Sequence, residues 1–239
     1  MFETPALHRF RYVAIEGPIG VGKSTLARKL AAHLGAELLL EQAQDNPFLD
    51  RFYEDMPGYA FQTQLAFLFQ RVKQMQAVAQ PGMFANAVVS DFLFEKDAIF
   101  ARLNLSDDEF RLYSQLYAQV APQVRAPDLV IWLQAAPPTL LRRIHRRAIP
   151  MEQGIAPDYL QRLCDAYVEY FHGYDGAPVF GLGTEHFNPV DNDADFELLL
   201  TRLAGFRGRR ELFDSHVFFR LNPPRDSRRA ERPSESSRC

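Results

Sequence analysis

The stretch of sequence that decides the fold is Gly17-Pro18-Ile19-Gly20-Val21-Gly22-Lys23-Ser24, which is followed by Thr25. It follows the pattern G-x-x-x-x-G-K-[S/T]. It stands between an apolar run at residues 12–15 and a segment with a leucine at every fourth position from 26 to 34. A strand, a glycine-bearing loop and a helix in this order form a phosphate-binding loop. A glycine-rich turn with a surface lysine is the alternative interpretation.

The chemistry of this loop suits a nucleoside triphosphate and its metal ion. Glycines let backbone N–H groups converge on phosphate oxygens at the positive end of a helix, Lys23 adds a positive charge, and the Ser24 hydroxyl can bind Mg²⁺. We therefore predict ATP and Mg²⁺ as cofactors. The predicted nucleotide-binding residues are Gly17, Gly20, Gly22, Lys23, Ser24 and Thr25.

The rest of the chain alternates short apolar runs with amphipathic segments. Strands are expected at residues 12–15, 37–40, 87–89 and 129–132 and near Val179. Helices are expected at residues 26–34, 59–80, 138–147, 158–172 and 195–203, and another begins at Ser106, where Glu109 completes a capping box. Strands that alternate with helices imply a parallel sheet, so we predict an α/β fold.

The composition changes near the C-terminal end of the chain. Residues 222–239 contain five arginines, three acidic residues, three prolines and no aliphatic side chain beyond Ala230. Such a segment cannot bury enough apolar surface to offset the entropy of ordering it. We expect one domain at residues 1–221 and a disordered tail at residues 222–239.

Charge and cysteine content exclude several classes of function. The 239-residue chain has a net charge of −3, which gives no general attraction to nucleic acid or to an anionic membrane. Cys164 and Cys239 lie far apart in the sequence, so neither a disulfide framework nor a zinc site is indicated. No stretch approaches the roughly 20 apolar residues of a membrane span, and residues 1–15 lack the apolar core of a signal peptide. We predict a cytoplasmic protein without nucleic-acid or membrane partners.

Two acidic residues stand at the ends of expected strands. Because ligands bind beyond the carboxyl ends of the strands in open α/β sheets, Glu41 and Asp91 are candidate site residues. Glu41 can act as a general base that accepts a hydroxyl proton, although its position alone also fits an exposed glutamate. Asp91 can hold Mg²⁺ or its water, as the Asp of Walker-B motifs does, or it can cap a helix.

Four arginines crowd the segment at residues 142–147. Arg143 and Arg147 are four positions apart, so on a helix they repel each other unless an anion lies between them. This spacing indicates a clamp for phosphate, and we predict catalytic roles for both. A solvated basic helix face is the alternative.

Together these residues resemble the deoxynucleoside kinase family, in particular its bacterial deoxyadenosine/deoxyguanosine kinase-like branch. The resemblance runs from Tyr12 to Phe213. It is carried by the phosphate loop, by Glu41 with Asp45-Asn46-Pro47-Phe48, by Phe52-Tyr53, by Tyr59-Ala60-Phe61-Gln62-Thr63-Gln64 with Arg71, by Ser90-Asp91-Phe92-Leu93-Phe94-Glu95-Lys96-Asp97, and by Glu152-Gln153-Gly154. The resemblance implies a P-loop kinase fold with a five-stranded parallel sheet flanked by helices, a short lid over the phosphates, and a homodimer.

The resemblance also implies a role for each matching residue. Glu41 matches the general base. The catalytic role of Lys23 and the metal site at Ser24 and Asp91 are predicted from the phosphate loop and the strand end. The residues that match substrate-binding positions are Tyr53 and Glu152 for the sugar 3′-hydroxyl, and Gln64, Arg71 and Asp97 for the base. A Gln amide both donates and accepts hydrogen bonds, and a carboxylate accepts from an exocyclic amine. Without the resemblance, Gln64 and Arg71 would be interpreted as the polar side of a long helix.

Three positions depart from the family pattern. Phe92 follows Asp91 where the family commonly has an arginine, and Ala98 stands where its close relatives carry one. Ile149 replaces the second arginine of the lid pattern Arg-Gly-Arg, which here is Arg147-Ala148-Ile149. Each absent arginine removes a charge from a reaction that depends on positioning and electrostatic stabilisation.

The expected function is ATP-dependent phosphorylation of the 5′-hydroxyl of a deoxynucleoside to its 5′-monophosphate, with deoxyadenosine or deoxyguanosine, or else deoxycytidine, as substrate. One alternative is a kinase of nucleoside monophosphates or another small metabolite, which needs arginines around a second phosphate and has less need of Glu41 as a base. A different alternative is a nucleotide-binding subunit with little turnover, which the residues Phe92, Ala98 and Ile149 motivate.

Overall fold

The computed structural model describes residues 7–78, 87–121 and 124–213. The tail expected at residues 222–239 lies outside the described residues, as do residues 214–221 of the expected domain and the last two residues of the helix expected at 59–80. Within the described part of the chain, none of the helices combines the length and the apolar character needed to cross a bilayer.

The centre of the fold is a parallel sheet in the order β2-β3-β1-β4-β5-β6. Its strands are β1 (Tyr12–Glu16), β2 (Glu37–Leu39), β3 (Val88–Ser90), β4 (Leu129–Gln134), β5 (Val179–Gly183) and β6 (Arg210–Phe213). All pairings are parallel, from Tyr12 opposite Val88 in the middle of the sheet to Leu182 opposite Phe213 at its edge. The predicted α/β class and parallel sheet are therefore confirmed.

The prediction of five strands is wrong by one, because β6 adds an edge strand beside β5. Its sequence is Arg210-Glu211-Leu212-Phe213, in which two of four residues are charged and the Leu212 side chain is 65% exposed. An edge strand that buries one face only has no continuous apolar run. The sequence of β6 therefore lacks the apolar run from which β1 and β4 were predicted.

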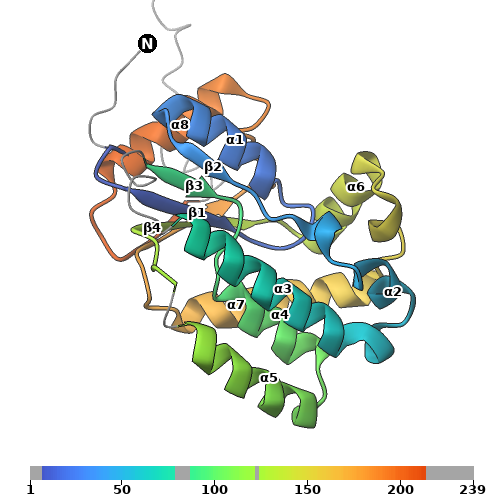
Figure 1. Cartoon of the computed structure of the whole chain (residues 1–239). Coiled ribbons are helices and arrows are strands. Elements are labelled where there is room, and N and C mark those ends of the chain that lie inside the picture. The colour runs from blue at the N-terminus through green and yellow to red at the C-terminus, as the bar shows by residue number, and fades with distance from the viewer. Residues whose placement is uncertain (1–6, 79–86, 122–123, 214–239) are drawn as a thin grey trace, which may run out of the picture.

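Helices cover both faces of the sheet (Figure 1). On one face lie α1 (Lys23–Leu34) and α8 (Asp193–Gly205), and on the other lie α3 (Met56–Val78), α4 (Lys96–Asn104) and α7 (Pro157–Gly173), with α5 (Asp107–Val120) outermost. The short helix α2 (Leu49–Glu54) and α6 (Pro137–Arg147) stand at the carboxyl end of the strands, with single 3₁₀ turns at Ala43–Asp45 and Pro150–Glu152. Helices α2 and α4 were not predicted from the sequence.

Two apolar clusters hold these layers together. The larger one is built on β1, which is buried along its whole length, and on the neighbouring strands β3 and β4. The smaller one joins α3, α4 and α5 through Leu68, Ala101 and Tyr113. The capping box predicted at Ser106 is present at the start of α5. The second cluster fixes α3 and α4 beside the carboxyl end of the sheet, where the polar residues gather.

Candidate active site

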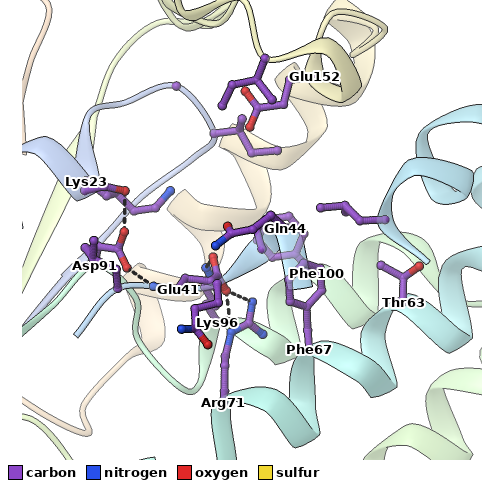
Figure 2. A pocket seen from close by; sticks show the side chains of 18 of the residues that line it. Lys23, Glu41, Gln44, Thr63, Phe67, Arg71, Asp91, Lys96, Phe100 and Glu152 are labelled. Atoms are coloured by element: carbon purple, nitrogen blue, oxygen red, sulfur yellow. Dashed lines mark hydrogen bonds and ion pairs between the residues drawn. The ribbon is translucent and has the colours of Figure 1, made fainter. Parts of the chain in front are cut away.

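A cavity of about 680 Å³ opens at the carboxyl end of the strands. Its walls come from the phosphate loop, the segment after β2, α2, α3, the start of α4 and the segment after α6 (Figure 2). The predicted site residues that line it are Gly20, Lys23, Ser24, Glu41, Tyr53, Gln64, Arg71, Asp91, Arg147 and Glu152. The structure therefore brings together residues that lie up to 132 positions apart in the sequence.

A second cavity of about 320 Å³ lies on the other side of the phosphate loop. It is lined by residues 20–26, by Arg143, Arg146 and Arg147 of α6, and by the segment after β5 that runs to Asp191. The two cavities share Gly20, Lys23, Ser24 and Arg147. The phosphate loop thus forms the boundary between two compartments, each large enough for part of a small ligand.

The loop glycines are required by the backbone path. Gly20 and Gly22 have φ angles of 82° and 106°, which side-chain-bearing residues rarely adopt. A Cβ on Gly17 would lie 2.4 Å from the carbonyl oxygen of Leu133. The Lys23 ammonium donates to the carbonyl oxygens of Gly17 at 2.7 Å and Pro18 at 3.2 Å, so it is held over the loop. Burial lowers the pKa of Lys23.

Asp91 connects the phosphate loop to the segment after β2. Its Oδ2 accepts a hydrogen bond from the Ser24 hydroxyl, and its Oδ1 accepts one from the backbone N–H of Glu41 at 2.6 Å. Helix α4 begins at Lys96 with Glu95 as its N-cap, so Asp91 does not cap a helix. A hydroxyl and a carboxylate side by side are the oxygen ligands that Mg²⁺ prefers.

Glu41 lies two residues beyond the end of β2 and is surrounded by two cations. Arg71 Nε donates to Glu41 Oε1 at 2.8 Å, with a further contact from Nη2, and Lys96 Nζ donates to Oε2 at 2.6 Å. Figure 2 shows these three side chains pointing toward one another on the cavity wall. Burial by itself raises the pKa of Glu41, but the charges of Arg71 and Lys96 outweigh it and hold the pKa well below its usual range. Glu41 is therefore an ionised carboxylate at neutral pH.

The residues expected to bind the base lie at different depths from the cavity surface. Gln64 and Arg71 line the cavity, whereas Asp97 is fully buried behind them and is not part of its surface. Asp97 forms an ion pair with Arg71 Nη1. Among the described residues, Asp97 Oδ2 and Gln64 Oε1 have no hydrogen-bond partner. Arg71 thus links Asp97 to Glu41. Gln74, which also lines the cavity, has an Oε1 that is likewise unpaired within the described part of the chain.

The residues expected to hold the sugar lie toward the lid. Glu152 stands in the 3₁₀ turn after α6 and forms an ion pair with Arg147. Tyr53 on α2 lines the same cavity. Burial raises the pKa of Tyr53, and the nearby negative charge of Glu152 raises it further. The Tyr53 hydroxyl is therefore a neutral hydrogen-bonding group close to a carboxylate.

The two arginines expected to share a phosphate have separate partners. The Arg143 guanidinium donates to the Thr184 carbonyl oxygen at 2.6 Å and to its hydroxyl at 2.9 Å, and it lines only the second cavity. Arg147 binds Glu152 and borders both cavities. Both arginines line the second cavity, but only Arg147 also borders the larger one.

The three departures from the family pattern lie in different surroundings. Phe92 is fully buried in the larger apolar cluster, Ala98 is half-buried on α4, and Ile149 lines the larger cavity. Ala148, between the lid positions, has a φ angle of 54° and is the only non-glycine residue with positive φ in the described part of the chain.

Two buried charged residues of the site were not found from the sequence. Glu16 ends β1 and is fully buried; its carboxylate accepts hydrogen bonds from the backbone N–H of Gly17 at 2.8 Å, of Leu93 at 2.7 Å, and from the Tyr167 hydroxyl at 2.8 Å. It therefore fixes the start of the phosphate loop to the segment after β3. Lys96 is the second. The signal for Glu16 was a charged residue directly after an apolar run, and Lys96 stands between two acidic residues in the motif at residues 90–97.

Comparison with known proteins agrees with this architecture. The family model described as deoxynucleoside kinase matches residues 13–206, from β1 to α8. The chain belongs to the deoxynucleoside kinase family. As a member of this family it is a phosphotransferase, and the resemblance stated from its motifs is confirmed.

Individual relatives extend over most of the domain. A deoxyguanosine kinase of Bacillus subtilis is 36% identical over 157 residues, which are 65% of this chain and 76% of the relative. A deoxyadenosine/deoxycytidine kinase of the same organism is 28% identical over 199 residues, 80% of this chain and 91% of the relative. A solved deoxyadenosine kinase from M. mycoides, with the products dCMP and a flexible dCDP bound, superposes with a TM-score of 0.69 at 26% identity and covers 82% of this chain and 100% of its own.

Proposed function

We propose that this protein transfers the γ-phosphoryl group of ATP to the 5′-hydroxyl of a deoxynucleoside and so makes the 5′-monophosphate. The observation that carries the proposal is the position of Glu41. Its carboxylate faces the larger cavity, and its backbone N–H is bonded to Asp91, which itself contacts Ser24 of the phosphate loop. A base is thus placed between a phosphate-binding loop and a cavity that can hold an acceptor.

The phosphate donor is proposed to bind in the smaller cavity. A nucleoside triphosphate would place its base and ribose beside residues 184–191 and its phosphates on the loop, where Lys23, Arg143, Arg146 and Arg147 supply positive charge. Arg143 would contact the donor rather than the acceptor, because it lines this cavity alone. Ser24 and Asp91 fit a Mg²⁺ ion that keeps its remaining positions for phosphate and water. When bound, this ion would neutralise charge on the phosphates.

The deoxynucleoside, which accepts the phosphoryl group, is proposed to bind in the larger cavity. We assign Tyr53 and Glu152 to the sugar 3′-hydroxyl, and Gln64 and Arg71 to the base. This orientation directs the 5′-hydroxyl toward Glu41, which takes its proton as the 5′-oxygen attacks. Asp97 would act by holding Arg71, because it is fully buried and lies outside the cavity surface.

The relatives support a purine or cytosine base. The proteins from Bacillus subtilis bear the names deoxyguanosine kinase and deoxyadenosine/deoxycytidine kinase. Each of these bases carries an exocyclic amine, which can donate to an acceptor such as Gln64 Oε1. We extend the proposal to a homodimer whose catalytic domain spans residues 1–221; light scattering after gel filtration tests the assembly.

A transfer assay with γ-labelled ATP tests the function. The protein is offered each of the four deoxynucleosides and each corresponding monophosphate, with Lys23→Ala as the matched inactive control. Labelled deoxynucleoside monophosphate is the expected product, and it should be absent with Lys23→Ala. Label on the monophosphates alone would identify a nucleoside monophosphate kinase, and ATP binding without transfer to any acceptor would identify a nucleotide-binding subunit. Either result overturns the proposal.

A further inference from the structure

Lys96 is a buried cation for which the fold itself offers no reason. Its side chain is 4% exposed, it is the first residue of α4, and it lines the larger cavity. A positive charge at the N-terminus of a helix is repelled by the helix dipole, and burial removes its hydration as well. A residue whose charge is unfavourable for both its helix position and its burial is expected at a functional site.

The Lys96 ammonium contacts the group that takes part in the reaction. Its Nζ donates to Glu41 Oε2 at 2.6 Å and stands 6.0 Å from the centre of the Phe100 ring, which also lines the cavity. Arg71 occupies the other oxygen of Glu41 and is itself paired with Asp97. Lys96, by contrast, has Glu41 as its single ion-pair partner among the described residues.

The charges of this cluster balance only while Glu41 is ionised. Arg71 and Lys96 carry two positive charges, and Glu41 and Asp97 carry two negative charges. When Glu41 accepts a proton, the cluster gains one positive charge, and Lys96 loses its anionic partner. A buried ammonium without a partner is strongly unfavourable. The phosphoryl group in transfer is then the nearby anion that can pair with the Lys96 ammonium.

We propose that Lys96 is a catalytic cation, whose ammonium passes from Glu41 to the transferred phosphoryl group as Glu41 takes up the 5′-hydroxyl proton. In this step the 5′-oxygen forms a bond to the γ-phosphorus, and the bond from that phosphorus to the β–γ bridging oxygen breaks. ADP leaves with the electron pair, and the hydroxyl proton stays on Glu41. The inference rests on the proposed function.

This role accounts for one departure from the family pattern. Phe92 follows Asp91 and is fully buried in the apolar cluster, so that position supplies no charge to the cavity. Lys96 is four residues further along the chain, and its side chain does reach the cavity. The cation is therefore present in the site although it comes from another position. Its donors would meet charge that develops on the phosphoryl oxygens.

Three substitutions at Lys96 test the inference. Lys96→Met removes the charge at similar volume, Lys96→Gln keeps a hydrogen-bond donor for Glu41, and Lys96→Arg keeps the charge. Lys73→Met, at an exposed position on α3, is the matched control. Removal of an electrostatic donor to a transition state costs about 10²-fold or more in kcat, so we expect that loss in Lys96→Met and Lys96→Gln, with KM within about threefold. Lys96→Arg should retain more activity than either, and Lys73→Met should match the wild type.

A binding measurement separates this role from support of Glu41. ADP with fluoroaluminate and Mg²⁺ mimics the phosphoryl group in transit when a deoxynucleoside is present. Lys96→Gln should weaken this complex by a factor close to its loss in kcat and leave binding of ADP alone unchanged. Equal fluoroaluminate affinity in Lys96→Gln and wild type, or kcat within about threefold of wild type, overturns the inference. A wild-type protein inactive on every deoxynucleoside would instead remove the proposed function itself.

Discussion

The backbone N–H of Glu41 donates a hydrogen bond to Asp91 Oδ1 over 2.6 Å, while Asp91 Oδ2 accepts from the Ser24 hydroxyl. One carboxylate thus positions the proposed base and contributes to the proposed metal site. The geometry couples two functions that in sequence are separated by 50 residues. A substitution of Asp91 should therefore disturb both, and the two effects can be measured separately.

Asp91→Asn keeps an oxygen that can accept from Glu41 but removes the negative charge. We expect the Mg²⁺ concentration for half-maximal activity to rise roughly tenfold or more, as is typical when the surroundings of a metal ion are altered. Asp91→Ala removes the tether too, so its kcat should fall further than that of Asp91→Asn at saturating Mg²⁺. A Mg²⁺ titration of both variants provides the comparison. Identical kcat values at saturation would show that the tether does not position Glu41.

Glu41→Gln retains the shape of the side chain but cannot accept the hydroxyl proton. Base catalysis contributes about 10²- to 10⁴-fold, so kcat should fall by roughly 10²-fold or more. The Kd for ATP, measured by calorimetry, should change little because Glu41 lines the larger cavity and not the smaller one. Glu54→Gln, exposed on α2, is the control. An unchanged kcat in Glu41→Gln removes Glu41 from the mechanism.

The backbone at Ala148 gives a prediction for stability. Its φ of 54° is in the left-handed region, which costs a residue with a Cβ about 1–2 kcal/mol and costs glycine nothing. Glycine also has the larger entropy in the unfolded chain, which cancels part of this gain. Ala148→Gly should therefore raise the free energy of unfolding by about 0.5–1 kcal/mol.

Ala32→Gly is the matched control for this prediction, because Ala32 is exposed inside α1 and has helical geometry. There the same substitution should lower the free energy of unfolding by about 1 kcal/mol. Denaturant unfolding of the three proteins measures both values. A destabilised Ala148→Gly would mean that the lid depends on the Ala148 side chain rather than on its backbone alone.

The sequence predicted the part of the site that depends on local geometry. The loop at residues 17–24 is a continuous segment whose glycines have a single structural purpose, and Asp91 directly follows β3, as expected. Glu41 lies two residues beyond β2 rather than at its end, but on the expected side of the sheet. Such features can be predicted from the sequence because they depend only on the position of a residue relative to its own strand.

Features that depend on several elements at once were not predictable in this way. In the sequence, Lys96 stands beside Asp97 and resembles an ordinary solvated charge. In the structure, Lys96 is buried and lines the cavity. Arg143 and Arg147 both line the smaller cavity, but the hydrogen bonds of the Arg143 guanidinium to Thr184, just after β5, could not be predicted. In both cases the partner lies more than 40 residues away, and a spacing rule for one helix contains no information about it.

The last prediction concerns the choice of base. Three acceptor oxygens at or behind the cavity wall, Gln64 Oε1, Gln74 Oε1 and Asp97 Oδ2, lack a hydrogen-bond partner among the described residues. Adenine, cytosine and guanine each carry an exocyclic amine that can donate to such an acceptor. Thymine has no exocyclic amine and presents carbonyl oxygens and a methyl group beside its single ring N–H. We therefore expect deoxyadenosine, deoxyguanosine or deoxycytidine to be preferred over thymidine.

The magnitude follows from the cost of leaving an acceptor unsatisfied. An unsatisfied buried polar group costs about 1–3 kcal/mol, more when it is charged, so kcat/KM should favour the best amine-bearing substrate over thymidine by at least about tenfold. Asp97→Ala should reduce this ratio, because it releases Arg71 from its ion pair and lets the guanidinium donate to a carbonyl oxygen of thymine. Asp107→Ala, at an exposed position on α5, should leave the ratio unchanged. The deciding measurement is kcat/KM for all four deoxynucleosides with the wild-type protein. Thymidine equal to or better than the best amine-bearing substrate would contradict the proposed base-reading set, whatever the variants do.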